Sequence, residues 1–575
     1  MPVNRRNMTT NKNPSQKSRL YLASYLSLGF FFLAIVALFF LVLYHFMHNT
    51  VTLSHLDKII YAGSSVPLVF LFLGGLLLST PFGNSFVSRK FQVSTDEIKL
   101  VRSQGYYRSL SIVVMLIVFA TVYLVYIDQK VAVYSLSTTR YHSDTIEYLE
   151  VGSYPLSSID FWAGIRSFSL PLFYKIAGYN FSNYMDQGNM NRVSQLQWYF
   201  SIICWTILAG SVCFALRNWI SRLFTFSIIL MMGASIDISF WDRVLLTESL
   251  AISLFVLLIA LLIIGGLLIE KAHKVPSCVQ VILVGIILLV AVLYAFIRDT
   301  DGYFLLFLAC FMLGGVGFRM IRKAALFPAY LSIALGFLVI FMLGNTSANT
   351  GERYVPPMLH VFAYRFIPQE QSRNFFLSRG MPFDNRIATL DTLTLHQLNS
   401  HLVTDPSILR LIAWLGKDGE QATMQYLISH PGYFLFAPLS DVQHIINGQY
   451  TVYRLTGITP VPSRISWLSS ILYLRFAWLP VFFLVLALAS IGLIFVKSNW
   501  ARIIWFIVLA AFLTAYPLAV IGWHGDTNDI ERHSVQVAIQ LRLAVWILLG
   551  LLVEWGYSFL RNKLNERAGK MENIL

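Results

Sequence analysis

One long apolar run indicates the class of this protein. Residues 241–269 read WDRVLLTESLAISLFVLLIALLIIGGLLI, and all the charged residues of this stretch precede Ser249. An uncharged apolar run of about 20 residues is long enough to cross the hydrocarbon core of a bilayer as one helix. We therefore predict a membrane-spanning helix over about 247–269, with Glu248 in its first turn and two acids, Asp237 and Asp242, in the turn before it.

Similar apolar segments recur along the chain. The 575 residues are 56% hydrophobic and 13% charged, whereas a soluble domain has roughly 25% charged residues. We predict an all-α polytopic membrane protein with about twelve membrane-spanning helices. They cover about 21–46, 59–80, 107–127, 196–216, 222–238, 247–269, 279–297, 302–318, 325–344, 475–496, 501–521 and 534–555.

The basic residues gather on one side of this predicted bundle. The two tails and the short connections between alternate helices hold a large basic excess, while the rest of the chain is slightly acidic. The positive-inside rule then places both termini in the cytoplasm. Membrane sidedness thus accounts for the net charge of +14, and we predict no nucleic-acid partner. None of the four cysteines lies in the outer loops, which fits a bacterial inner membrane.

Three outer regions are too long or too polar to be simple connections. Region 128–195 contains short apolar pieces, which indicate interfacial helices lying on the membrane. Region 345–474 is long enough for a small extracytoplasmic domain. It divides the chain into 1–344, 345–474 and 475–575. The third region, 522–534, is short and dense in ionisable groups.

The first outer region holds the strongest catalytic candidate, Asp144. If SDTIEYLEVG (143–152) is helical, Asp144 and Tyr148 are four residues apart and share a face. A carboxylate there could act as a general base towards an acceptor hydroxyl, with Tyr148 beside the substrate. The alternative is a solvated loop in which Asp144 is only a helix N-cap.

A second candidate site is the very short turn RDTDGYFLL (298–306) between two predicted spans. Arg298 at a helix end near the headgroups could bind a phosphate with two parallel hydrogen bonds. Asp299 and Asp301 would suit Mg²⁺ or Mn²⁺, and no other cofactor is indicated. The alternative is that Arg298 pairs with one of these acids or extends to the interface.

The third outer region adds a dense ionisable cluster that includes Glu531, Arg532 and His533. Arg542 follows two to three turns into the next apolar helix, where a bare charge costs at least a few kcal/mol. We expect it to face an acid or a lipid phosphate. The clusters therefore converge on the outer face and predict a cavity with acids for base or metal chemistry and arginines for phosphate.

At these residues the chain resembles the GT-C superfamily of polytopic glycosyltransferases, such as protein O-mannosyltransferases and the aminoarabinose transferases of lipid A. The resemblance depends on SDTIEYLEVG, its continuation RSFSLPLFYKIAG (166–178), WDRVLLTESLAISLFVLLIAL (241–261) and RDTDGYFLL. It departs from the family where proline does not directly follow Arg166, and where the large outer region precedes the last three spans.

The resemblance implies an inverting transfer of a sugar from a polyprenyl-phosphate donor to an acceptor hydroxyl of a glycan, lipid or protein. Asp144 would be the base and Arg298 the main phosphate ligand, with Arg166, Arg532 and Arg542 as further candidates. Glu248, Glu531 and His533 would bind or orient the substrate. A ligase or polymerase for preassembled lipid-linked oligosaccharide, and a lipid or sugar transporter, are the alternatives.

Overall fold

The computed structural model describes most of the chain beyond residue 103. It covers residues 104–572 except 137, 184–185, 271–276, 318–326, 394–397, 399–403, 448–466, 469–470, 474–480, 482–483, 486, 489, 493–498 and 528–529. The predicted spans 21–46 and 59–80 lie outside the described residues, and 475–496 lies only partly inside. The chain divides into two compact units, residues 1–118 with 552–575, and residues 119–551. The second unit holds all the candidate site residues.

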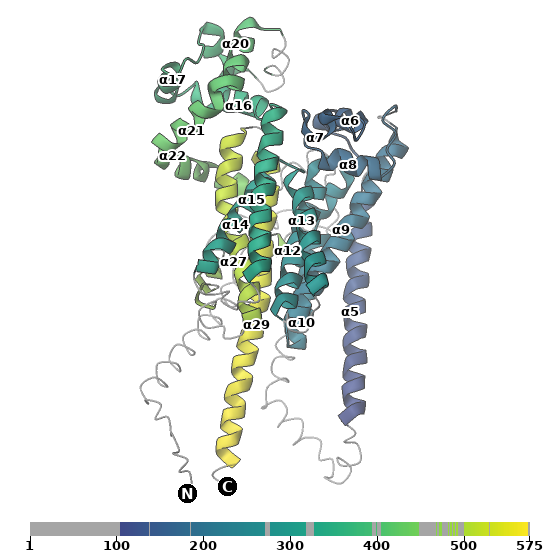
Figure 1. The fold of residues 1–575 in the computed structure, drawn as a ribbon. Helices are drawn as coiled ribbons and strands as arrows, with labels where there is room; N and C mark the ends of the chain where they lie inside the picture. The colour runs from purple at the N-terminus through teal and green to yellow at the C-terminus, as the bar shows by residue number, and fades with distance from the viewer. Residues whose placement is uncertain are drawn as a thin grey trace, which may run out of the picture. The chain divides into compact units, whose positions relative to one another are not determined.

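The described part of the chain is helical. It contains no β-strand, and Arg140 and Val244 form an isolated parallel β-bridge. Seven of its helices are long and apolar enough to cross a membrane, so the chain is a polytopic membrane protein (Figure 1). They are α5 (Gln104–Tyr134), α9 (Gln187–Ala215), α12 (Thr247–Glu270), α13 (Ser277–Ala295), α15 (Phe327–Thr350), α27 (Asn499–Gly525) and α29 (Val535–Glu572).

The predicted limits of several helices are too short, and α5 and α9 are two examples. Helix α5 continues to Tyr134, beyond the predicted end at 127, and α9 begins at Gln187 rather than 196. In α5 the polar continuation stays helical because its Lys130 side chain is fully buried against neighbouring helices. Helix α14 (Asp301–Gly317) is apolar but shorter than the seven.

The predicted span 222–238 is a broken helix. Helix α10 (Trp219–Ala234) ends at Ser235, whose backbone is extended, and α11 (Ile236–Ser239) with η1 (Phe240–Arg243) continues at a bend of 52°. If this pair is one span, the described helices make up to eight. Close packing on α9 needs a glycine here, because a Cβ at Gly233 would lie 2.5 Å from the Trp205 ring.

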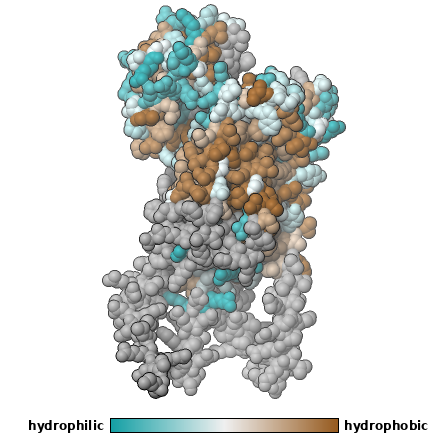
Figure 2. Space-filling model, in the orientation of Figure 1, coloured by the Kyte–Doolittle hydropathy of each residue, from teal (hydrophilic) through white to brown (hydrophobic). Residues whose placement is uncertain are grey.

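Helix α12 packs against α9, α13 and α27, and its first turn lies beside the turn after α13, where Arg298 Nε donates to the Thr247 hydroxyl. Short helices gather at that end, namely α6 (Ser143–Ser153), α7 (Ile159–Ala163) and α8 (Ser169–Ile176) (Figure 1). Helices α7 and α8 lie in the apolar piece for which interfacial helices were predicted, and α6 is the segment that carries Asp144. In Figure 2 the hydrophobic side chains of this face form a band on the long helices, below the hydrophilic cover of the region that follows α15.

The region after α15 is a set of short helices with an apolar core of its own. Helix α15 runs to Thr350, past the predicted boundary at 344, and a turn then leads into α16 (Val355–Val361). The core includes the aromatic residues Phe362, Phe366, Phe376, Trp414 and Tyr426. The other helices include α17 (Glu370–Leu377), α20 (Pro406–Trp414), α21 (Glu420–Ser429), α22 (Pro431–Phe436) and α23 (Val442–Asn447). Since α16 and α22 contact α27, this region is packed directly onto the long helices.

Candidate active site

Asp144 lies in the first turn of α6, and its position is set by the residues on either side. The N-cap is His142, whose ring nitrogen accepts from the Asp144 N–H, while the Thr145 hydroxyl accepts from the His142 N–H. The interpretation of Asp144 as the N-cap is therefore wrong. Thr145 is fully buried and also donates to the Leu245 carbonyl at 2.7 Å, which ties α6 to the segment before α12.

The Asp144 carboxylate contacts two arginines. Arg532 Nη1 donates to it at 2.8 Å, and Arg166 Nη2 lies 3.9 Å away while its Nε donates to Glu147 at 2.6 Å. Burial alone would raise the pKa of Asp144. The contact with His142 and the charges of Arg532 and Arg166 outweigh it and hold this pKa well below its usual range. The side chain is ionised at neutral pH.

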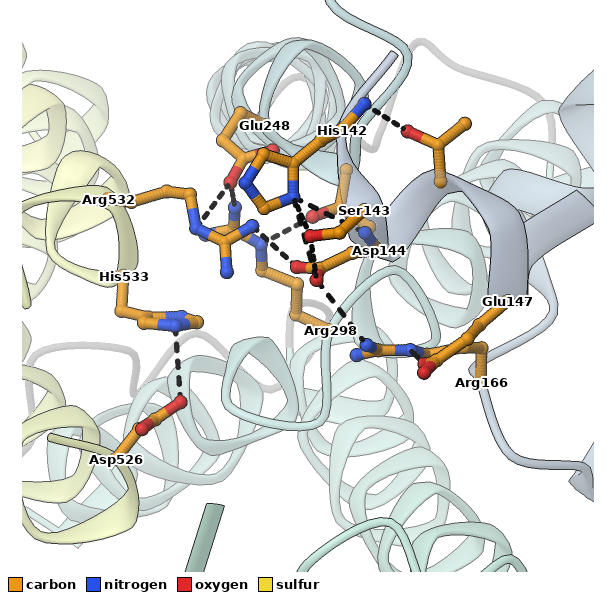
Figure 3. Close-up of polar contacts among 12 residues, drawn as sticks. His142, Ser143, Asp144, Glu147, Arg166, Glu248, Arg298, Asp526, Arg532 and His533 are labelled. Carbon is orange, nitrogen blue, oxygen red and sulfur yellow. Dashed lines mark hydrogen bonds and ion pairs between the residues drawn. The ribbon is translucent and has the colours of Figure 1, made fainter. Parts of the chain in front are cut away.

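Arg532 connects Asp144 to a second, buried acid. Glu248 is 1% exposed and forms ion pairs with Arg298 and with Arg532, the latter at 3.9 Å (Figure 3). Arg298 Nε also donates to the Thr247 hydroxyl at 2.7 Å. The turn after α13, the first turn of α12 and the short helix α28 (Ile530–His533) thus each supply one member of an arginine–glutamate–arginine group.

Tyr148 lies one helical turn from Asp144, on the same side of α6. The Arg166 guanidinium lies 5.2 Å from the centre of its ring, within the range of a cation–π contact. Burial raises the pKa of Tyr148, so its hydroxyl keeps its proton. This arrangement leaves the Arg166 guanidinium between an aromatic ring and two acids.

These side chains line one cavity of about 320 Å³. Asp144, Tyr148, Arg166, Arg298 and Arg532 all contribute to its wall. Its volume is in the range of small-molecule sites, and it lies at the ends of apolar helices. With Asp299, Asp301 and His533, which also line it, the cavity brings eight predicted site residues together, from parts of the sequence up to 388 positions apart. His533 also lines the cavity and pairs with Asp526 at 3.3 Å.

Two predicted site residues point elsewhere. The Glu531 carboxylate contacts His444 Nδ1 at 2.7 Å, on α23, and is not part of the cavity wall. Arg542 is fully buried and lies 3.7 Å from the centre of the Tyr473 ring, near the charge of Asp237. Its guanidinium therefore faces an aromatic ring and is not part of the cavity wall.

Asp299 and Asp301 do not make a metal site with their neighbours. Both oxygens of Asp299 accept from Arg353, and Asp301 is buried at the start of α14. Among the described residues, no group of three or more His, Cys, Asp and Glu side chains could hold a metal ion. The donor set here does not fit Mg²⁺ or Mn²⁺, and we derive no step through a metal.

Two residues that support the structure, Arg353 and Lys130, were not predicted from the sequence. Arg353 donates to Asp299 and to the Gly164 carbonyl, and so joins the turn of Arg298 to the loop of Arg166. Lys130 donates to Asp242 at 2.9 Å inside the bundle. Of the two, Lys130 could have been found from the sequence, because a single lysine soon after an apolar run is compatible with a longer helix. Nothing in the sequence around Arg353 distinguishes it from a solvated arginine.

Comparisons with known proteins give little beyond this geometry. No protein-family model and no curated protein matches the chain. Among solved structures it is similar to an archaeal oligosaccharyltransferase from Archaeoglobus fulgidus, in complex with an inhibitory peptide and a dolichol-phosphate. The identity is 12% and the TM-score 0.39, over 82% of this chain and 52% of that one, so the chain spans about half the length of that enzyme. A likeness at this level establishes no shared function, and the assignment depends on the site itself.

Proposed function

We propose that the chain is an inverting glycosyltransferase that moves a sugar from a polyprenyl-phosphate donor to an acceptor hydroxyl at the extracytoplasmic membrane face. The observation that carries the proposal is the position of Arg532, which lines the cavity together with Asp144 and contacts both Asp144 and Glu248, an acid buried behind the cavity wall. A general base and cations for a leaving phosphate are the two components that this reaction needs.

The chemical step follows from these roles. The acceptor oxygen attacks the anomeric carbon as Asp144 takes the hydroxyl proton. The bond from that carbon to the phosphate oxygen breaks, and the electron pair leaves with the polyprenyl phosphate. Arg298 and Arg532 stabilise the charge that develops on this leaving group, and the configuration inverts because attack and departure occur on opposite faces.

Donor binding also makes Asp144 a better base. While Arg532 and Arg166 contact it, Asp144 has a depressed pKa and is therefore a weak proton acceptor. The donor phosphate competes with Asp144 and Glu248 for the same guanidinium groups. A carboxylate that shares Arg532 with a phosphate has a pKa closer to that of an ordinary acid, which suits a general base.

The test is transfer of a radiolabelled sugar from a polyprenyl-phosphate donor in membranes, with wild type and Asp144→Asn. Losing a general base lowers turnover by about 10²- to 10⁴-fold. Asp160→Asn is the matched control, because Asp160 is an exposed acid in the first turn of α7 and contacts Ser158 rather than the cavity. Equal transfer by wild type and Asp144→Asn would reject the role of Asp144.

Transport is the second candidate, because one observation favours it. The α10–α11 break places Asp237 and Asp242, both buried, at a bent helix, and broken helices are typical of transporter binding sites. Against this, neither acid lines the cavity, and Asp242 is bound by Lys130 and Ser249. If the wild type turns over no lipid-linked sugar but moves one across proteoliposomes, transport is the better assignment.

A further inference from the structure

The cavity has a second polar part, which differs in chemistry from the arginine cluster. It is lined by side chains from α14, α15, the turn before α16, and α21. They are Tyr303, Phe341, Asn345, Asn349, Tyr354 and Glu420. None of these six is basic, and Arg353, which lines the cavity beside them, donates to both oxygens of Asp299, so among the described residues this part offers no unpaired cation for a phosphate.

Three of these side chains form one face of α15. Phe341, Asn345 and Asn349 are spaced four residues apart, so they lie one above another on the helix surface. Both asparagines are exposed, and no side-chain hydrogen bond to either of them occurs within the described ranges. The Tyr303 ring packs on Phe341 edge-to-face at 5.1 Å, which continues the face as an aromatic surface.

Glu420 completes this face as its only acid. It is the first residue of α21 and is exposed. It lines the same cavity as Tyr303 and Tyr354. Across the part of the chain that the structure describes, Glu420 has no ion pair, whereas Asp144, Asp299 and Asp526 each contact a cationic or histidine side chain.

The chemistry of this face selects one class of ligand. Amide side chains both donate and accept, a carboxylate accepts, and ring faces pack against C–H groups. A neutral, hydroxyl-rich ligand uses all three. An extended peptide that binds by strand addition needs the exposed edge of a sheet. The elements that line this face are helices, whose backbone groups are paired internally.

We propose that this face binds the acceptor, and that the acceptor is a neutral saccharide whose hydroxyl is presented to Asp144. The inference rests on the proposed function for the role of the bound saccharide, although binding itself does not require turnover. The Asn345–Asn349 pair holds the ring hydroxyls, Tyr303 contacts the ring, and Glu420 accepts from a hydroxyl on the opposite side.

Binding is tested directly on the detergent-solubilised full chain by saturation-transfer-difference NMR, with methyl glycosides of glucose, galactose, mannose and N-acetylglucosamine as probes. We expect a signal from at least one glycoside with wild type and with Asp144→Asn. It should fall severalfold in Glu420→Gln and in Asn345→Ala/Asn349→Ala. Glu370→Gln and Asn374→Ala are the controls, because Glu370 is likewise an exposed first residue of a helix, and both control residues are exposed on α17 outside the cavity.

Transfer gives the second readout. With the glycoside that binds best as acceptor, each test variant should raise the apparent KM by about tenfold, as expected for one or two lost hydrogen bonds, and leave kcat near wild type. Unchanged glycoside signals in both test variants would overturn the acceptor site. Transfer to a serine- or threonine-containing peptide but to no glycoside would overturn the saccharide class. Normal glycoside binding without any turnover of a lipid donor would instead reject the proposed function and leave the binding site standing.

Discussion

Two clusters of charged side chains lie close to the segment that leads into α12, and they differ in how far their side chains are exposed. Lys130 and Asp242 are sealed inside the bundle, with side chains 0% and 2% exposed. Lys130 also donates to Ser201 at 2.8 Å, and the second Asp242 oxygen accepts from Ser249 at 2.6 Å. Asp144 has an equally close arginine, yet its side chain is 24% exposed and borders the cavity.

This comparison shows that a charged residue among the long apolar helices is not by itself a catalytic group. The Lys130–Asp242 cluster is buried and does not line the cavity, so a ligand could replace one of its partners only if the local structure unfolded. In the Asp144–Arg532–Glu248 cluster a phosphate entering the cavity can take over one of the contacts. We therefore expect the first cluster to govern stability and the second to govern turnover.

The largest effect should come from breaking the sealed pair. Lys130→Met leaves Asp242 as an uncompensated buried charge, which costs about 3–5 kcal/mol. SDS titration of the purified protein measures this loss in the free energy of unfolding. The double variant Lys130→Met/Asp242→Asn removes both charges and should recover much of the loss. If the single variant is as stable as wild type, the pair is not structural and the comparison fails.

The second-largest effect should be weaker donor binding, without a loss of protein stability. Arg298→Ala removes a phosphate ligand from the cavity wall, and loss of one such preorganised donor costs about 10²- to 10³-fold in transfer. We expect weaker binding of polyprenyl phosphate, measured by equilibrium dialysis with a labelled lipid. Arg298→Lys keeps the charge without the planar pair of donors and should be intermediate. Unchanged affinity for the lipid phosphate in Arg298→Ala would contradict the phosphate role.

The smallest effect tests the link between the two clusters. Thr145→Val removes the hydroxyl that accepts from His142 and donates to Leu245. Each lost hydrogen bond contributes about 1 kcal/mol, so transfer should fall by roughly tenfold through kcat, with the KM for donor little changed. Thr145→Ser keeps the hydroxyl and should behave as wild type. A change in KM alone would show that Thr145 does not position Asp144.

Sequence reasoning was most successful where the signal is local. Apolar runs of sufficient length predicted the polytopic helical class, and the spacing of Asp144 and Tyr148 predicted their shared face on α6. It was less successful at the helix ends, because hydropathy records the polarity of Lys130 and not the buried acid that lets α5 continue.

Pairing between distant residues could not be predicted either. Glu531, Arg532 and His533 are consecutive, yet they face His444, Asp144 and Asp526 respectively. On a helix of four residues, neighbouring side chains diverge, and only the packing of other elements determines which of them faces a cavity. Asp299 shows the same limit, because its partner Arg353 is 54 positions away.

The distance in sequence between Asp144 and Arg532 has a consequence for biosynthesis. A ribosome makes α6, α12 and the Arg298 turn long before it makes α28, which contributes Arg532. While the chain is still growing, Glu248 can already pair with Arg298, but Asp144 lacks the arginine that contacts it most closely. The order of synthesis therefore keeps the site incomplete until the loop between α27 and α29 has reached its place, and a chain that stalls earlier carries the acid without its main counter-charge.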